Sequence, residues 1–396
     1  MKHAHHLLRR LFAVLIGIVF LGSGLLKMLD PVGTRLIVTE YVKFFHLAFL
    51  IPAAKGIGLL LAFLEATVGT ALIMGVYRKL TAAATSLMVA FFTLVTLILL
   101  VGNAEMDCGC FGEWIHLTHF QSFLKNIVLV LLCLGAFLPF RHFGATRTKR
   151  LVAFWVIVPS LLFNLVYALR HLPLLDFTEF APGAELYASL DEPYQAQDGY
   201  MASYIYERGG QRGSFTLDHL PDSTWTFVGV DTVYRNGPKR NDAQPVLSFR
   251  DAEGVYQDDR AAQGRVMVFS VYDVQRADWD RIGNEAERAQ EAGAMPLVLA
   301  AATPEEVDRA GVPWELAVYY ADYKTLVTLN RANGGATYFY DGELIAKWAP
   351  VDFPDQRHLV RLLGRDPVEA STDFIVGRRL KVQGFLLYLI AVMTLL

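Results

Sequence analysis

The chain has 396 residues with a net charge of −3, and 54% of its residues are hydrophobic and 19% charged. Its three cysteines are too few for a disulfide-rich scaffold, and its basic residues adjoin apolar runs, which argues against a nucleic-acid-binding surface. The charges are segregated. Residues 172–380 contain 20 Lys and Arg against 33 Asp and Glu, whereas the rest contains 16 against 6. The composition predicts an apolar membrane block followed by an acidic globular domain, and no metal site is expected.

Five apolar runs in the first 170 residues are each long enough to cross about 30 Å of hydrocarbon. They are Leu7–Leu26, Ala53–Tyr77, Leu80–Val101, Gln121–Phe140 and Leu151–Leu169. The first run is too long for a signal peptide and has no small-residue cleavage site, so we expect it to be retained as a spanning helix. Residues 35–50 are amphipathic and are expected to lie at the membrane interface.

The basic residues of the short loops predict the orientation of these helices. One side carries Lys2, Arg9, Arg10, Arg78, Lys79, Arg141, Arg147, Lys149 and Arg150. The positive-inside rule makes this side cytoplasmic, together with the N-terminus. The loop after the third run and everything after the fifth would then lie on the outer side of the membrane.

The segment Asp107-Cys108-Gly109-Cys110-Phe111-Gly112 lies in a polar gap between two apolar runs. Two cysteines one residue apart can form a strained, easily reduced disulfide or remain a dithiol. The same residues also fit a tight structural loop. In an oxidising compartment the pair would be either a structural bridge or a redox centre. Cys133, in the middle of the fourth run, is expected to be inert core.

Three polar residues inside the apolar runs are candidate site residues, because such residues are costly in a membrane unless they face a bundle interior. Glu65 lies halfway along the second run and is the candidate proton acceptor. Lys27 ends the first run and Asn126 lies near the start of the fourth; both are candidate binding residues, as are Asp107 and Phe111. For Lys27, snorkelling to the interface is an equally good explanation.

The membrane block resembles the DoxX/MauE group of four-helix membrane proteins. The resemblance rests on residues 22–31 (GSGLLKMLDP), 63–69 (FLEATVG), Arg78 and 108–112 (CGCFG), in that order. It implies a four-helix bundle related to membrane thiol:quinone oxidoreductases. DoxX relatives are linked with quinone-coupled sulfur oxidation, and MauE with maturation of a disulfide-rich periplasmic dehydrogenase. Quinone is therefore a candidate cofactor, although the residues themselves identify none.

The acidic domain begins with a predicted β-rich segment and continues with alternating strands and helices. The β-rich segment has strands at Tyr204–Tyr206, Ser214–Leu217, Trp225–Val230 and Asp231–Tyr234. The following strands are Arg265–Tyr272, Met295–Ala300, Ala317–Tyr320, Gly335–Tyr340 and Glu343–Trp348. The helices between and after them are Ala277–Ala292, Pro304–Ala310, Lys324–Asn330 and Pro354–Leu363.

This element order resembles that of thioredoxin-like domains over residues 264–364. Residues 273–276 (DVQR) stand where relatives carry CxxC, and Gly334-Gly335 stand where relatives carry a cis-proline. The domain is therefore expected to bind a partner or to be structural rather than to exchange disulfides. A DoxX/MauE-like bundle joined to such a domain resembles a family of Bacteroidetes inner-membrane proteins.

The expected fold is thus a membrane α-helical bundle followed by an α/β thioredoxin-like domain. The expected domains are a four-helix bundle at 1–145, a fifth spanning helix at 146–172, a β-rich preamble at 173–263, the thioredoxin-like fold at 264–366 and a linker with an apolar anchor or sixth spanning helix at 367–396. Two functions remain open: an enzyme of thiol-disulfide or quinone-linked redox chemistry, and a non-enzymatic scaffold or assembly factor. In both, the partners are the lipid bilayer and an envelope protein.

Overall fold

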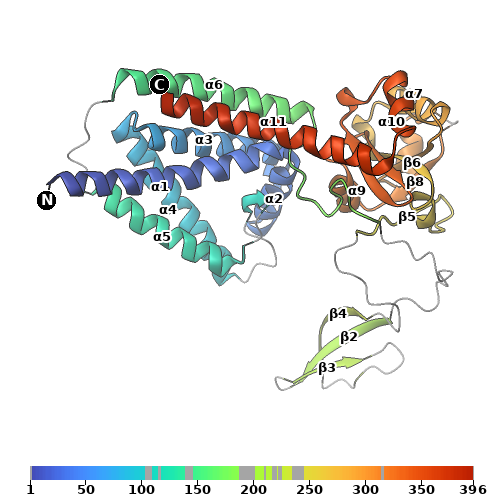
Figure 1. The fold of residues 1–396 in the computed structure, drawn as a ribbon. Helices are drawn as coiled ribbons and strands as arrows, with labels where there is room; N and C mark the ends of the chain where they lie inside the picture. Colours follow the sequence, from blue (N-terminus) through green and yellow to red (C-terminus); the bar gives the residue numbers. More distant parts are fainter. Residues whose placement is uncertain are drawn as a thin grey trace.

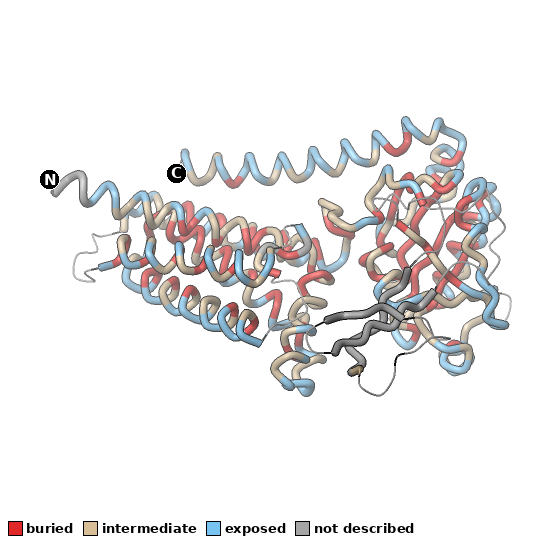
Figure 2. The backbone as a smooth tube through the Cα atoms, turned by 90° about the horizontal axis from the view of Figure 1, so that it is seen from below, coloured by how far each residue is buried: buried red, intermediate tan, exposed pale blue. Residues whose placement is uncertain are grey.

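The computed structural model describes residues 2–102, 109–114, 117–138, 146–186, 201–208, 211–215, 221, 225–233, 245–313 and 316–395. A bundle of long helices lies beside a sheet domain, and the two chain ends lie at the end of the bundle far from that domain (Figure 1). Buried residues concentrate along the bundle interior and in the sheet (Figure 2).

The bundle contains the five predicted apolar helices and one more. They are α1 Lys2–Leu29, α2 Pro31–Phe44, α3 Ala54–Met74, α4 Arg78–Val101, α5 His119–Phe137 and α6 Thr148–Arg170. All but α2 are long and apolar enough to cross a membrane, so the five expected spans are confirmed by helix length and composition. The segment predicted at 35–50 is instead two elements, because α2 starts at Pro31 and a 3-10 helix follows at Ala48–Ala53.

Local signals set the helix limits more sharply than hydropathy does. The Asp30 side chain accepts a bond from Gly33 N, and Pro31 occupies the first turn of α2, where its missing N–H is not needed. Thr118 and Gln121 form a capping box, so α5 begins at His119 rather than at Gln121. Gly75 ends α3 in the left-handed conformation at φ 69°.

Helices α1 and α3 cross with almost no side chain between them. A Cβ atom built on Gly24 would lie 2.5 Å from the carbonyl oxygen of Ala62, and one on Gly17 would lie 2.9 Å from that of Gly69. Small residues allow such close approach between membrane helices. The crossing brings polar side chains of the two helices within hydrogen-bonding distance of each other.

The C-terminal apolar tail is the end of a much longer helix than the sequence predicts. Helix α11 spans Pro367–Leu395 and runs back from the sheet domain along the bundle (Figure 1). Its Leu389 is buried with Ile157 and Leu161 of α6, and Tyr388 Oη lies 2.9 Å from Ser160 Oγ. Hydropathy identifies only the last 15 residues as an apolar segment, because the first half of the helix is polar. It therefore could not predict that the two halves form one helix.

The sheet domain is built on six strands in the order β10-β9-β6-β7-β8-β5. Their limits are β5 Phe249–Arg250, β6 Arg265–Val271, β7 Met295–Ala300, β8 Val318–Ala321, β9 Gly335–Tyr340 and β10 Glu343–Trp348. Strands β6, β7 and β8 are parallel, and β9, β10 and β5 are antiparallel to their neighbours. All five predicted strands are present, whereas the two-residue edge strand β5 has no periodicity that could predict it.

Helices cover the two faces of this sheet and complete its core. They are α7 Trp279–Glu291, α8 Pro304–Arg309, α9 Tyr323–Leu329 and α10 Gln356–Leu363, with short 3-10 helices at Asp258–Ala261, Val274–Arg276 and Pro350–Asp352. Helices α7, α8 and α10 contribute to one buried cluster, which contains Phe269, and α9 to the other, which contains Phe339. Trp279, Ile282, Ala286 and Ala289 of α7 are buried, and Thr303 and Glu306 form a capping box at the start of α8.

A separate three-stranded antiparallel sheet, in the order β3-β2-β4, precedes this domain. Its strands are β2 Met201–Arg208, β3 Gln211–Phe215 and β4 Thr226–Val233. Strands β2 and β3 pair from Tyr204 with Phe215 to Arg208 with Gln211, in agreement with the first two predicted strands, although Gly209, Gly210, Leu217 and Tyr234 lie outside the described residues. The two predicted strands at 225–234 are one continuous strand.

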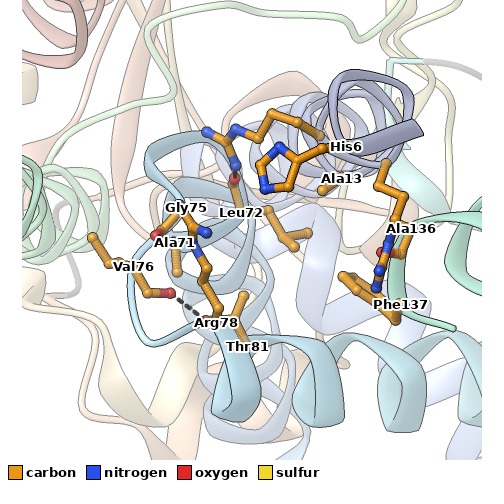
Figure 3. A pocket seen from close by; sticks show the side chains of 12 residues that line it. His6, Ala13, Ala71, Leu72, Gly75, Val76, Arg78, Thr81, Ala136 and Phe137 are labelled. Atoms are coloured by element: carbon orange, nitrogen blue, oxygen red, sulfur yellow. Dashed lines mark hydrogen bonds between the residues drawn. The ribbon is translucent and has the colours of Figure 1, made fainter. Parts of the chain in front are cut away.

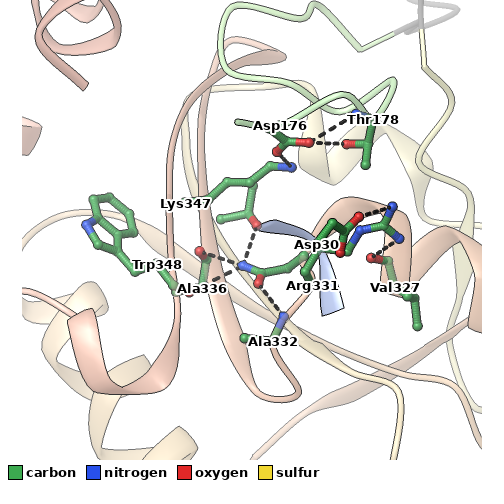
Figure 4. Close-up of polar contacts among 11 residues, drawn as sticks. Asp30, Asp176, Thr178, Val327, Arg331, Ala332, Ala336, Lys347 and Trp348 are labelled. Atoms are coloured by element: carbon green, nitrogen blue, oxygen red, sulfur yellow. Dashed lines mark hydrogen bonds and ion pairs between the residues drawn. The ribbon is translucent and has the colours of Figure 1, made fainter. Parts of the chain in front are cut away.

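A buried ion pair anchors the start of the sheet domain to β10. Lys347 Nζ lies 2.8 Å from Asp176 Oδ2, and Thr178 also donates to Asp176 (Figure 4). Burial raises the pKa of Asp176, but the Lys347 ammonium and these hydrogen bonds lower it by more, so the pKa lies below the ordinary carboxyl value. The carboxylate is thus held in its charged form.

Candidate functional site

The polar centre of the bundle is an ion pair between α1 and α3. Glu65 is 1% exposed, and its carboxylate oxygens lie 2.8 and 3.0 Å from Lys27 Nζ. The two residues were predicted separately, and the close helix crossing brings them together. Lys27 does not snorkel away from the bundle, because its ammonium turns inward, 5.7 Å from the Phe92 ring centroid.

Ser23 connects this ion pair to the CxC loop. Its Oγ lies 2.7 Å from Glu65 Oε2 and 2.7 Å from the carbonyl oxygen of Cys110. One hydroxyl has one proton and can donate to only one of these acceptors at a time. A proton on Glu65 would reverse the first bond, so that Glu65 donates to Ser23 and Ser23 donates to Cys110. Ser23 therefore links the Glu65 carboxylate to the backbone of the loop.

The glycines of the CxC loop are required by its backbone. Gly109 has φ 59° and Gly112 has φ 64°, values that L side chains rarely adopt. A Cβ atom on Gly109 would also collide with Ile37 of α2. The strand β1, Cys110–Glu113, therefore packs tightly against the ends of α1 and α2. This geometry gives a structural reason for the CGCFG pattern that is independent of thiol chemistry.

A cavity of about 90 Å³ lies directly beside the site. It is enclosed by α1, α2, α3, α4 and the loop, and its polar lining includes Lys27, Tyr41 and Thr96. Gly109 and Cys110 form part of its wall, and most of the remaining lining is apolar, including Phe92 and Ile37. An apolar cavity with a few convergent polar groups is typical of a small-molecule site.

Asn126 of α5 is buried in the bundle and contacts α4. It is 2% exposed, and its Nδ2 donates to the carbonyl oxygen of Phe92 at 3.2 Å and to Thr96 Oγ1 at 3.1 Å. It therefore joins α5 to Phe92 and Thr96, two of the three α4 residues that line the cavity. The structure thus gives Asn126 a positioning contact rather than a place in the cavity wall.

Not every predicted site residue can be placed. Asp107 and Cys108 lie outside the described residues, as does the side chain of Phe111. Cys133 is buried among apolar side chains of α1, α4 and α5, which agrees with the expected inert core position. Ser23 was missed, although it precedes Lys27 by four residues and thus shares its helix face.

A second buried contact joins the bundle to the sheet domain. Asp30 Oδ2, immediately after α1, lies 3.1 Å from Arg331 Nη2, and the Arg331 side chain is 5% exposed (Figure 4). Arg331 Nη1 donates to the carbonyl oxygen of Val327 at 3.3 Å. Sequence reasoning missed this contact, because 300 intervening residues carry no signal for it.

The loop that carries Arg331 also holds the segment after β6. Asn333 Oδ1 accepts bonds from the backbone N–H groups of Tyr272 and Asp273, and Tyr272 Oη donates to the carbonyl oxygen of Arg331 at 3.1 Å. Burial, reinforced by Tyr323, raises the pKa of Tyr272 to about 12, so its hydroxyl is a neutral donor. A cavity of about 280 Å³ between bundle and domain is lined by Tyr272, Arg331 and Asn333 together with Lys55 and others.

The fold and the site define a helical membrane protein with a buried polar centre beneath a CxC loop. Comparison with known families agrees: residues 5–139 match the family described as Methylamine utilisation protein MauE. The membrane part of the chain is therefore MauE-like. Residues 200–234, which include the three-stranded sheet, match a domain of unknown function (DUF8463).

One curated relative and the solved structures complete the comparison. The chain is 28% identical over 148 residues to Protein TlpB of Flavobacterium psychrophilum. The match covers 37% of this chain and 39% of that protein, so the chain spans well under half the length of that relative. No solved structure matches the chain.

Proposed function

We propose that this chain is a membrane thiol-disulfide protein in which Cys108 and Cys110 are the redox pair. The observation that carries the proposal is the Ser23 hydroxyl, which lies within hydrogen-bonding distance of both the Glu65 carboxylate and the Cys110 carbonyl. A buried carboxylate two hydrogen bonds from the backbone of the loop would serve as acceptor for a proton that thiol oxidation releases. The match of residues 5–139 to the MauE family supports the same assignment.

The proposed chemistry is the oxidation of the two thiols to a disulfide. Forming the S–S bond breaks two S–H bonds and releases two protons and two electrons. Glu65 takes one of these protons and loses its charge attraction to Lys27, while the acceptor of the two electrons takes the other proton and later receives the first one from Glu65. Ser23 then turns its own proton to the Cys110 carbonyl, as the two 2.7 Å distances allow. The step thereby couples the redox state of the loop to the α1–α3 ion pair.

The electrons require an acceptor, and we propose a quinone in the cavity beside Cys110. The lining suits its head group, since Lys27 and Tyr41 offer donors for carbonyl oxygens and Phe92 offers an aromatic face. A quinone supplies an acceptor for two electrons and two protons. The residues of the chain bind and orient the ring and keep water from the site.

We further propose that the sheet domain is thioredoxin-like and periplasmic. The core order β7-β6-β9-β10, with β6 and β7 parallel and β9 and β10 antiparallel, supports the fold. The Asp30–Arg331 contact lies at the C-terminal end of α1, which is also the end that contacts the CxC loop. Arg9, Arg10 and Arg78 lie at the opposite end of the bundle. Under the positive-inside rule, this arrangement supports a cytoplasmic N-terminus and a periplasmic domain.

Thiol trapping in intact cells tests the redox proposal. Cells expressing the chain are treated with dithiothreitol, washed and sampled with an alkylating reagent that adds mass to free thiols. We expect Cys108 and Cys110 to be reduced and then reoxidised, with reoxidation in Glu65→Gln slowed by about 10²-fold. Cys133→Ser is the matched control and should behave as the wild type. A pair that never changes state, or a Cys108→Ser/Cys110→Ser variant that fully complements a deletion at normal abundance, refutes the proposal.

The second candidate is a non-enzymatic scaffold or assembly factor, favoured by the sheet domain. All three cysteines lie in the membrane block, so the domain cannot exchange disulfides. The segment after β6, where a thioredoxin-like active site would lie, is held by Asn333 in the loop that docks on Asp30. Under this alternative the CxC is a structural staple, and loss of function follows disruption of the sheet domain rather than loss of the cysteines.

A further inference from the structure

A second cavity, of about 80 Å³, lies at the opposite end of the bundle from the Glu65 site. His6 of α1, Gly75 after α3, Arg78 of α4 and Phe137 of α5 surround it (Figure 3). Four helix ends therefore meet around one cavity, at the level where a spanning bundle leaves the hydrocarbon.

The charge of this cavity is strongly positive. Arg9, Arg10 and Arg78 line it, and no Asp or Glu is among the described residues of its wall. Three guanidinium groups around a small space repel one another and favour an anion between them. A ligand carrying a negative charge would thus stabilise the arrangement.

The arginines are held in place by the carbonyl groups of helix ends. Arg10 donates to the carbonyl oxygens of Leu72 and Ile73, at 2.6 Å for the first, and Arg78 Nε donates to that of Gly75 at 3.1 Å. These oxygens lie at the C-terminus of α3 and have no partner within the helix. A guanidinium carries five N–H donors, so the bonds to helix ends orient Arg10 and Arg78 and leave further donors for a ligand.

The rest of the wall is apolar. Ala13, Ala71, Leu72, Val76 and Phe137 form it beneath the arginines. A soluble anion would gain nothing from this surface, whereas an acyl chain would. Basic pockets between membrane helices bind anionic lipid head groups by the same combination of charge and burial. We infer that this cavity binds the phosphate group of an anionic phospholipid through Arg9, Arg10 and Arg78.

Lipid titration of the purified full chain in non-ionic detergent tests the inference. Thermal unfolding is followed while dioleoyl phosphatidylglycerol, dioleoyl phosphatidylcholine or inorganic phosphate is added. Because a ligand that binds only the folded state raises its stability, we expect phosphatidylglycerol to raise the unfolding temperature more than phosphatidylcholine does. Arg78→Gln should weaken the apparent affinity for phosphatidylglycerol about tenfold, the cost of one charge-assisted hydrogen bond.

Lys79→Gln is the matched control. Lys79 is the neighbour of Arg78 in the sequence, but its side chain is exposed and lies outside the cavity wall, so the substitution removes the same charge without touching the cavity. Arg78→Lys retains the charge and replaces Arg78→Gln in the lipid titration if Arg78→Gln does not fold. If inorganic phosphate stabilises the wild type and this effect is lost in Arg78→Gln, the cavity is a phosphate site for a soluble ligand, and the assignment to a phospholipid is wrong. Equal stabilisation by the two lipids, or an equal loss of affinity in Lys79→Gln, overturns the inference, because the arginines would then only cap helix ends.

Discussion

Replacing Glu65 with glutamine removes the negative partner of Lys27 and preserves the shape of the side chain. At 2.8 Å and an effective dielectric constant of about 20, the lost attraction is at most about 6 kcal/mol. Removing one partner of a buried ion pair usually costs about 3–5 kcal/mol. Lys27 is 13% exposed at the helix end, and the glutamine oxygen still accepts hydrogen bonds. We therefore expect a loss of about 2–4 kcal/mol.

The free energy of unfolding is measured by titrating mixed micelles with dodecyl sulfate. A double-mutant cycle with Lys27→Met isolates the interaction between the two side chains. Asp373→Asn is the matched control, because Asp373 pairs with Arg365 at 3.1 Å and both are more than half exposed. That exposed pair should contribute less than about 1 kcal/mol. A Glu65→Gln loss as small as that of Asp373→Asn would refute a closed, buried ion pair.

Three further outcomes follow from other contacts. Arg331→Gln should loosen the sheet domain from Asp30 and speed proteolysis between bundle and domain about tenfold, and an unchanged cleavage rate would contradict the docking contact. The pKa of Asp176 is lowered in the folded state, so its stabilising effect is present above about pH 4 and is lost as the pH falls below that value. Unfolding temperatures measured on acidification should therefore fall more for the wild type than for Asp176→Asn/Lys347→Met, and parallel curves would exclude this role. Asn126→Leu should cost about 1–2 kcal/mol by leaving no donor for Thr96, and an unaltered unfolding curve would contradict that contact.

The amino-acid sequence alone determined where the chain meets the membrane. Hydropathy depends on composition over about 20 residues and needs no partner, so the five spans were predictable to within a few residues. The strands from Arg265 to Trp348 were equally visible, since their apolar runs are local. Gly109 and Gly112 marked a special loop for a similar reason, because a positive φ is a property of the residue itself.

Only the tertiary structure decided which polar residues share a site. Lys27 and Glu65 are 38 residues apart, and what joins them is a helix crossing permitted by Gly24 and Gly69. Asp30 and Arg331 are paired across two domains, and the full length of α11 depends on its packing along α6. Such contacts follow from how whole elements pack, and packing depends on many residues at once. A sequence therefore shows that a buried charge needs a partner, but the fold selects which residue that partner is.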